Sequence, residues 1–318
     1  MTNDNFRVNT IYIISKGRPR CRTAQTLERI RYPGQWFIVC GNNDEALLQY
    51  RERWGEKVLV FDWYDEITRT DTMDNFGFEK YPSGACPVRN ATRRISEERG
   101  EVRHWQFDDD YLGFTIWSRE GRKNVTIADG TTLYEAMLKI AEFGHHARLQ
   151  NIGFVLDTME SHPEQRYTFS PRVFNAHNLP STPDLFVPWV GRMNDDIVNA
   201  INVWRRGGYE LSVKYLHIEF AKTQSEPGGM TDLYRNDGTA RKTAYGVLAA
   251  PSAVKLVYRF DRYHHATAWQ KLRPKLIQGK WRREDGQLPP SPPQKIRDAN
   301  VMLAEKWRKR LLNGRKKG

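Results

Sequence analysis

Strand-like apolar runs and helical segments alternate through the first 110 residues of the chain. Predicted strands lie at residues 10–15, 36–40, 58–61 and 102–107. The first is a continuous apolar run typical of strands buried on both faces of a sheet, and the last contains a short apolar-aromatic stretch. Segments that we predict as helices lie between them, at 23–30, 44–54 and 87–99, the last with a proline near its first turn. This order predicts an α/β fold with a mostly parallel central sheet and helices on both faces.

The pattern is less regular after residue 111. We expect helices at 131–149 and 195–206, strands at 153–156 and 211–220, and a hairpin or meander at 167–169 and 172–174. A proline-rich spacer at 289–293 precedes a basic segment with one apolar stripe, formed by Ile296, Leu303, Trp307 and Leu311. We therefore expect a main domain over 1–270 and a basic C-terminal extension over 271–318 that ends in an amphipathic helix.

An acidic triplet, Asp108-Asp109-Asp110, follows the fourth predicted strand. Three carboxylates at the exit of a buried strand repel one another and lose hydration, so a cation among them would stabilise the arrangement. Mg²⁺ and Mn²⁺ prefer oxygen ligands and are commonly shared between carboxylates and a substrate diphosphate. The triplet therefore indicates a metal–diphosphate site, and an acidic surface turn is the alternative.

A basic motif, Lys16-Gly17-Arg18, follows the first predicted strand. In parallel sheets, ligands bind beyond the carboxyl ends of the strands. We expect this motif and the triplet to share one crevice. A second acidic motif, Asn194-Asp195-Asp196, opens the predicted helix at 195–206; taken by itself it has the composition of a helix start.

The net charge of +12 is concentrated at the C-terminal end. Residues 251–318 carry 18 Lys and Arg against 5 Asp and Glu, whereas residues 1–250 are close to neutral. A neutral body with a basic tail indicates a polyanionic partner such as nucleic acid, because Lys and Arg displace phosphate counterions. A tail that only aids solubility is the alternative.

Composition limits the class of protein. The 318 residues are 39% hydrophobic, with 10 Trp, 14 Tyr and 14 Phe, as in a globular protein. No apolar stretch is long enough to span a membrane, and the first residues do not resemble a secretory signal. The three cysteines, Cys21, Cys40 and Cys86, lack metal-binding spacing and fit reduced thiols. We expect a cytoplasmic protein with no membrane association, and no feature indicates an obligate protein partner.

The order of these motifs resembles glycosyltransferases of the GT-A fold and, more closely, the TET-associated glycosyltransferase family of phages, which is linked to DNA carrying 5-hydroxymethylcytosine. Asp110 is commonly Asn and Asp195 commonly Glu in that pattern. The segments that carry the resemblance are 11–18, Arg89-Asn90, 105–110, Asn194-Asp195-Asp196, Thr223-Gln224, Gly228-Gly229-Met230 and Arg262-Tyr263-His264-His265.

The resemblance implies a UDP-sugar donor, a divalent ion (Mn²⁺ or Mg²⁺) and double-stranded DNA with hydroxymethylated cytosine as acceptor. It divides the main domain into a nucleotide-sugar-binding half, 1–115, and an acceptor-side half, 116–270. Asp196 is the expected general base of an inverting transfer, with Asp195 as second choice. The implied donor-binding residues are Ser15, Lys16, Gly17, Arg18, Arg89, Asn90 and Asp109. The implied metal ligands are Asp108, Asp110, His264 and His265, and the implied acceptor loop contains Gln224, Gly228 and Gly229.

Several assignments stay open at this stage. His217 is a further metal candidate, although a lone strand histidine is more often a core residue. Trp63, Tyr64, Phe76 and Phe78 are candidates for stacking on an extruded base, or else core residues. A GT-A enzyme with a protein, polysaccharide or lipid acceptor, a non-catalytic DNA-binding module and a metal nuclease are the competing interpretations.

Overall fold

The structure, a computed structural model, describes residues 9–74, 84–118, 123–156, 167–169, 173, 175–220 and 231–273, with three single positions at 298, 302 and 305. The chain divides into two compact units, residues 1–274 and 275–318, and every element below belongs to the first. The expected acceptor loop, the stacking candidates Phe76 and Phe78, the proline-rich spacer and nearly all of the expected C-terminal helix lie outside the described residues.

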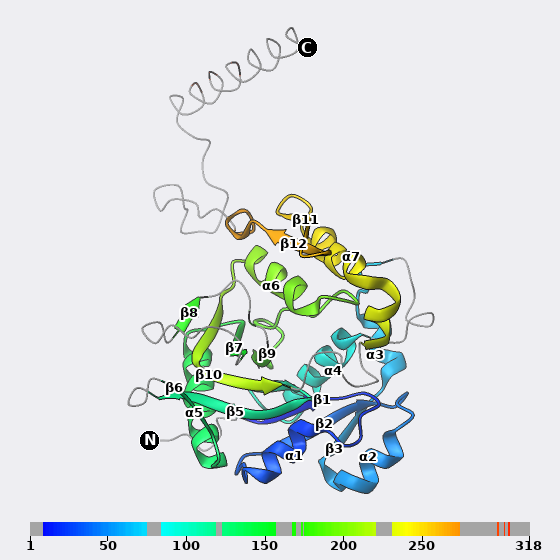
Figure 1. Cartoon of the computed structure of the whole chain (residues 1–318), viewed down its shortest axis with the longest axis vertical. Coiled ribbons are helices and arrows are strands. Elements are labelled where there is room, and N and C mark those ends of the chain that lie inside the picture. The colour runs from blue at the N-terminus through cyan, green and yellow to red at the C-terminus, as the bar shows by residue number, and fades with distance from the viewer. Residues whose placement is uncertain are drawn as a thin grey trace. The chain divides into compact units, whose positions relative to one another are not determined.

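The first half of the unit follows the predicted alternation of strands and helices (Figure 1). Its elements are β1 (Ile11–Ile14), α1 (Arg22–Arg29), β2 (Trp36–Gly41), α2 (Leu47–Trp54), β3 (Val58–Phe61), α3 (Trp63–Arg69), α4 (Ala85–Glu98) and β4 (Arg103–Asp108). β1 pairs in parallel with both β2 and β4, and β2 pairs in parallel with β3. The apolar runs therefore form the parallel half of a larger sheet.

The second half completes this sheet with strands of both directions. Its elements are β5 (Tyr111–Ser118), β6 (Lys123–Thr126), α5 (Gly130–His146), β7 (Asn151–Leu156), β8 (Tyr167–Phe169), β9 (Asn175–Pro180), α6 (Asp195–Arg205), β10 (Glu210–Phe220), α7 (Thr231–Ala249), β11 (Val254–Arg259) and β12 (Arg262–Thr267). The strand order is β3-β2-β1-β4-β9-β7-β10-β5-β6, with β8 beside β10. β9 and β5 are antiparallel to their neighbours, while β7 and β10 are parallel to each other.

Helices cover both faces of the sheet, as the sequence predicts. Successive strand residues point to opposite faces, so Ile11 and Ile13 pack into one core with α1, α2 and α5. Tyr12, between them, packs into a second core with residues of α3 and α4, including Trp63 and Ala91. The mostly parallel α/β fold is therefore confirmed.

A third buried cluster joins α6, α7 and β11, with Ile197, Tyr245 and Val254 among its members. Figure 1 shows these elements together with β12 at one end of the unit. β11 and β12 form a separate two-stranded sheet that the sequence analysis did not predict. Of the expected hairpin or meander at 167–169 and 172–174, the first arm is β8, which pairs with β10, and most of the second arm lies outside the described residues.

Candidate functional site

The carboxyl ends of β1 and β4 lie side by side, as expected for adjacent parallel strands. Ile14 is in register with Asp108, so Ser15 and the basic motif leave the sheet beside the acidic triplet. β5 starts directly after the triplet, at Tyr111, but pairs with β10 and β6 and not with β4. The triplet is therefore the point at which the chain crosses from the parallel half of the sheet to the mixed half.

Strand alternation sends the first two aspartates to opposite faces of the sheet. On β4, Phe107 packs on the α1 side, whereas Gln106 donates from its side-chain amide to the Arg89 carbonyl of α4 at 2.9 Å. By the same alternation, the side chain of Asp108 points toward α4 and that of Asp109 points toward α1. Asp109 accepts hydrogen bonds from Ser15 Oγ at 2.5 Å and from Arg18 Nη1 at 2.8 Å. Its carboxylate thus fixes the loop after β1.

Arg89 joins the two acidic motifs that the sequence analysis identified. Its guanidinium contacts Asp195 Oδ2 through Nε at 2.9 Å and Asp108 Oδ1 through Nη2 at 3.2 Å. Burial alone would lower the pKa of Arg89, but the carboxylates of Asp195 and Asp108 outweigh that effect and raise it. The third nitrogen, Nη1, is buried and has no hydrogen-bond partner within the described residues.

Asp110 is the least compensated member of the triplet. Its Oδ1 is buried and accepts no hydrogen bond from the residues that the structure describes. Burial, followed by repulsion from Asp108 and Asp109, raises the pKa of Asp110 to about 7. Burial also raises the pKa of both Asp108 and Asp109. Loss of solvation and mutual repulsion are what a bound cation would relieve.

The loop after β1 is held by α2 and by the segment before it. Gly17 donates its backbone N–H to Asp44 Oδ2 at 2.9 Å, and Arg18 donates its own to Tyr50 Oη at 2.8 Å. Gly17 has φ +68°, and a Cβ there would meet no atom within 4 Å, so backbone conformation is what favours glycine. Lys16 Nζ lies 4.8 Å from the centre of the Trp63 ring.

Asn90 has a structural contact that the sequence did not reveal. Its amide oxygen accepts from the Trp189 backbone N–H at 2.9 Å, and its Nδ2 donates to the Trp189 carbonyl, also at 2.9 Å. The Trp189 ring lies 4.6 Å from the Arg89 guanidinium. Asn90 therefore holds the segment before α6 beneath Arg89, and its donor-binding role stays a prediction. No local sequence signal marks Trp189 as part of this arrangement.

The second acidic motif begins α6. Asn194 precedes the helix in the left-handed conformation, with φ 60°, and Asp195 and Asp196 occupy the first turn. Their position there favours the helix, because acids complement the positive end of its dipole. Asp195 is held by Arg89, and Asp196 is partly exposed beside it.

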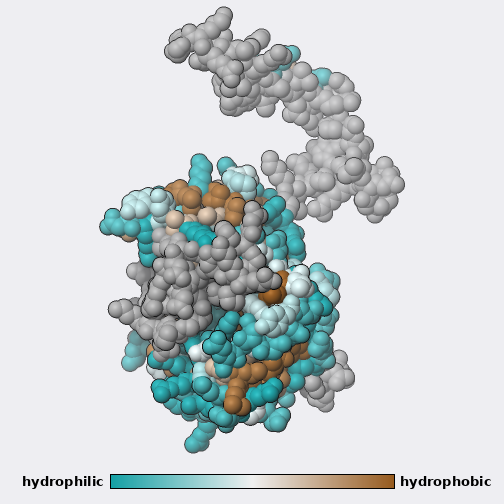
Figure 2. All heavy atoms as spheres, turned by 90° about the vertical axis from the view of Figure 1, so that its right-hand side faces the viewer, coloured by the Kyte–Doolittle hydropathy of each residue, from teal (hydrophilic) through white to brown (hydrophobic). Residues whose placement is uncertain are grey.

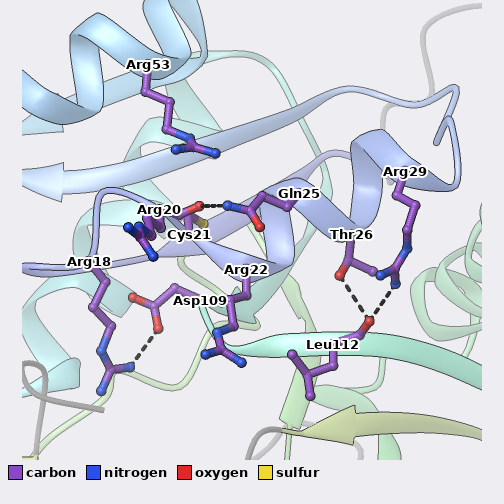
Figure 3. Close-up of a pocket in the computed structure, with 10 residues that line it drawn as sticks. All are labelled: Arg18, Arg20, Cys21, Arg22, Gln25, Thr26, Arg29, Arg53, Asp109 and Leu112. Atoms are coloured by element: carbon purple, nitrogen blue, oxygen red, sulfur yellow. Dashed lines mark hydrogen bonds and ion pairs between the residues drawn. The ribbon is translucent and has the colours of Figure 1, made fainter.

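A basic cavity of about 750 Å³ adjoins Asp109 on the α1 side of the sheet (Figure 3). Figure 3 shows guanidinium groups converging on it from α1, α2 and the loop after β1. One carboxylate, that of Asp109, accompanies five arginines in the lining, namely Arg18, Arg20, Arg22, Arg29 and Arg53. Such an excess of positive charge indicates an anionic ligand, because clustered arginines repel one another and bind phosphate oxygens well.

The remaining candidates lie elsewhere in the fold. His264 and His265 are on β12, outside the ten-stranded sheet, and His264 Nε2 accepts from Arg262 Nε at 3.3 Å. His217 is buried on β10, in register with Thr115. Of the aromatic candidates that are described, Trp63 is buried and Tyr64 exposed. The metal roles of these histidines stay predictions.

The triplet fits a divalent ion. In the described part of the chain no three His, Cys, Asp or Glu side chains gather as a complete metal site. Mg²⁺-type sites usually need only one or two carboxylates, because substrate phosphates and water supply the other ligands. The orphaned Oδ1 of Asp110 and the raised pKa of both Asp108 and Asp110 are the observations that support such an ion here.

The fold and this site define an α/β protein with a charged crevice at the carboxyl edge of its sheet. A model of the family described as TET-Associated Glycosyltransferase matches residues 9–229. The chain therefore belongs to the TET-associated glycosyltransferase family.

The chain also shows weak likenesses to solved structures. No curated protein matches the chain. GalNAc-T7, solved with UDP, GalNAc and Mn²⁺, is 11% identical with a TM-score of 0.37, over 69% of this chain and 44% of that one. Mannose-1-phosphate geranyltransferase from Thermus thermophilus is 12% identical with a TM-score of 0.29, over 77% of this chain and 65% of that one. The chain thus spans less than two thirds of either protein. Among the described residues, no helix is long and apolar enough to cross a membrane.

Proposed function

We propose that this GT-A-type glycosyltransferase transfers a sugar from a UDP-sugar to 5-hydroxymethylcytosine in double-stranded DNA. The observation that carries the proposal is the uncompensated carboxylate of Asp110 at the shared end of β1 and β4. It lies next to Asp109, which lines a cavity with five arginines. A site with both oxygen ligands for a cation and guanidinium groups suits a nucleoside diphosphate.

On this proposal, the donor lies across the end of β1. Ser15 and Arg18 are fixed by Asp109, and the backbone at Gly17 is fixed by Asp44, so the loop is organised before the donor arrives. Arg89 Nη1, buried and unpartnered within the described residues, adds a hydrogen-bond donor on the α4 side. When bound between Asp108 and Asp110, a divalent ion supplies charge stabilisation for the departing diphosphate.

Asp196 is our proposed general base. Bond cleavage at the anomeric carbon proceeds through an oxocarbenium-like state, and the attacking hydroxyl must lose its proton. Asp195 Oδ2 already accepts a hydrogen bond from Arg89 Nε at 2.9 Å, so this oxygen is engaged within the protein. Asp196, in the same helical turn, is partly exposed toward solvent. Transfer by direct displacement would invert the anomeric configuration.

The reaction is tested with Mn²⁺, a panel of UDP-sugars and duplex DNA containing 5-hydroxymethylcytosine, followed by mass spectrometry of the nucleosides. We expect a hexose or pentose mass on the modified base, and its absence with every donor would refute the proposal. Asp196→Asn should reduce transfer at least 100-fold without changing UDP–Mn²⁺ binding. Glu142→Gln, an exposed acid on α5, is the matched control.

A further inference from the structure

The β11–β12 hairpin ends in a turn with an unusual sequence. Arg259 is in register with Arg262, so the turn consists of Phe260 and Asp261 alone. Both have positive φ, 51° and 56°, as a two-residue type I′ turn requires. Asn-Gly is the common choice for such a turn, because a bulky residue strains the left-handed conformation. Phenylalanine at this position therefore needs a reason other than the turn itself.

The ring of Phe260 projects into solvent. Phe260 is 87% exposed, which exceeds the exposure of every other large hydrophobic residue in the described part of the chain. Next to it, Tyr258 and Tyr263 are paired across the strands, with ring centroids 5.3 Å apart. Figure 2 shows apolar and hydrophilic surface side by side at the end of the unit that α7, β11 and β12 form. An apolar tip above aromatic residues is therefore displayed on a narrow hairpin.

Positive charge flanks this tip. Arg259 and Arg262 face each other across the hairpin, and like charges in directly opposite positions destabilise a strand pair. Within the described residues, neither guanidinium makes an ion pair, and both side chains are exposed. Arg262 Nε donates to His264 Nε2 at 3.3 Å, but neither arginine has an acidic partner among the described residues. Two exposed arginines on either side of an exposed ring are complementary to a ligand with phosphates at its edge and stacked apolar rings at its centre, which is the chemistry of duplex DNA.

The hairpin is also connected to the expected catalytic helix. β11 and β12 pack on α7, and α7 packs on α6. Val254 of the hairpin and Ile197 of α6 belong to one buried cluster, and Ile197 directly follows Asp195 and Asp196. The hairpin and the proposed base therefore belong to one packed layer of the fold.

We propose that the β11–β12 hairpin is a wedge that opens duplex DNA, with Phe260 inserted between bases and Arg259 and Arg262 on the backbone phosphates. This inference rests on the proposed function, since a base inside a duplex must leave the stack to enter a crevice. Apolar side chains that enter a base step unstack it in this way. The hairpin lies outside residues 9–229, which the family model matches.

The first experiment separates duplex opening from catalysis. A 2-aminopurine beside the modified cytosine should gain fluorescence on binding of the wild-type protein, because unstacking relieves its quenching. Phe260→Asn should abolish most of that gain while favouring the turn, since asparagine accepts positive φ. Phe143→Ala, which removes an exposed ring from α5, is the matched control and should keep the wild-type signal. An equal fluorescence gain with Phe260→Asn would overturn the wedge. This fluorescence measurement needs no sugar transfer, so its result is independent of whether the proposed reaction occurs.

The second experiment compares substrates. Phe260→Asn should lower transfer to duplex DNA at least tenfold, and transfer to the same single strand less than threefold, because that strand needs no opening. Equal losses on the two substrates would contradict the proposal.

The double substitution Arg259→Gln and Arg262→Gln tests the phosphate contacts. It should flatten the slope of the logarithm of the DNA-binding constant against the logarithm of the salt concentration by about 1.8, because each phosphate contact contributes about 0.9. An unchanged slope would exclude the phosphate contacts. A wild-type dimer that Phe260→Asn converts to a monomer would instead identify the hairpin as a protein interface.

Discussion

Arg89 and Asp195 form an ion pair between two helices, α4 and α6, that are more than one hundred residues apart in the chain. Arg89 Nε lies 2.9 Å from Asp195 Oδ2, and the same guanidinium reaches Asp108 on β4. Both partners are largely withdrawn from solvent, with side-chain exposures of 6% and 19%. One guanidinium is therefore shared by two carboxylates that come from separate parts of the fold.

Replacing Arg89 should destabilise the protein strongly. Arg89→Met keeps much of the volume but leaves two half-buried carboxylates without this counter-ion, and we expect the free energy of unfolding to fall by about 3 kcal/mol, the lower end of the range for a buried pair. Urea denaturation measures the change. Arg51→Met removes an exposed arginine of α2 and should change stability by less than about 0.5 kcal/mol. Similar effects of the two substitutions would show that Arg89 has no such role.

Asp110→Asn should separate stability from function. The pKa of Asp110 is raised to about 7, so its carboxylate is unfavourable in the folded protein above that pH. The amide removes this charge, and at pH 8 without added metal we expect a gain on the order of 1–2 kcal/mol. The same substitution should abolish Mn²⁺-dependent UDP binding, as measured by isothermal titration. Loss of stability together with intact binding would contradict both expectations.

Glu210 should make stability depend on pH. Burial, with a smaller contribution from Asp196, raises the pKa of Glu210 to about 8, although Asn151 donates to it at 2.9 Å. Between pH 4.5 and about pH 8, Glu210 is thus protonated in the folded protein, whereas the same side chain is ionised in the unfolded chain. Its contribution to stability is complete below pH 4.5, falls as pH rises, and is lost above about pH 8.

The test for Glu210 is a comparison of pH profiles. Glu210→Gln keeps a neutral side chain of the same size, so thermal unfolding of this variant should lose less stability between pH 5 and pH 8 than the wild type. We expect the free energies of unfolding of the two proteins to diverge by at most about 1.4 kcal/mol per pH unit over that range. Parallel profiles would show that Glu210 titrates normally.

Asn90→Ala should destabilise the segment before α6. The substitution leaves the Trp189 N–H and carbonyl without partners in a buried region, which costs about 1–3 kcal/mol. Gln49→Ala on the exposed face of α2 is the control. If Asn90 served the donor alone, stability without UDP would be unchanged, and only the affinity for UDP would fall.

Periodicity predicted the elements whose burial is apolar. β1 to β3 are continuous apolar runs, β4 carries Trp105 and Phe107 at alternate positions, and each strand lies within two residues of its expected position. β9, with the sequence Asn-Ala-His-Asn-Leu-Pro, was missed because His177 and Asn178 at its centre are polar although buried. Asn178 there accepts from Arg103 Nε at 2.6 Å, and His177 contacts Asn151. Such a strand is stabilised by partners that are distant in sequence, which no local pattern reveals.

The candidate site was predictable to a similar extent. Adjacent parallel strands bring their ends together, so the meeting of Ser15 and Arg18 with Asp109 followed from topology alone. The bridge from Arg89 to Asp195 did not, because it depends on how α4 and α6 pack. The cavity with five arginines depends on where α1, α2 and the loop after β1 lie relative to one another, which a count of charges along the chain does not reveal.

The insertion of β9 beside β4 has a consequence for how the protein assembles. β4 obtains its second neighbour from residues 175–180, which are synthesised about seventy positions later. Until they arrive, the strand that ends in the aspartate triplet is an open edge with unpaired backbone groups, prone to pair with other chains. A fragment ending at residue 115 should therefore aggregate when expressed alone. Both halves of the sheet belong to one compact unit, and the contact between Arg89 and Asp195 forms only after the two have come together.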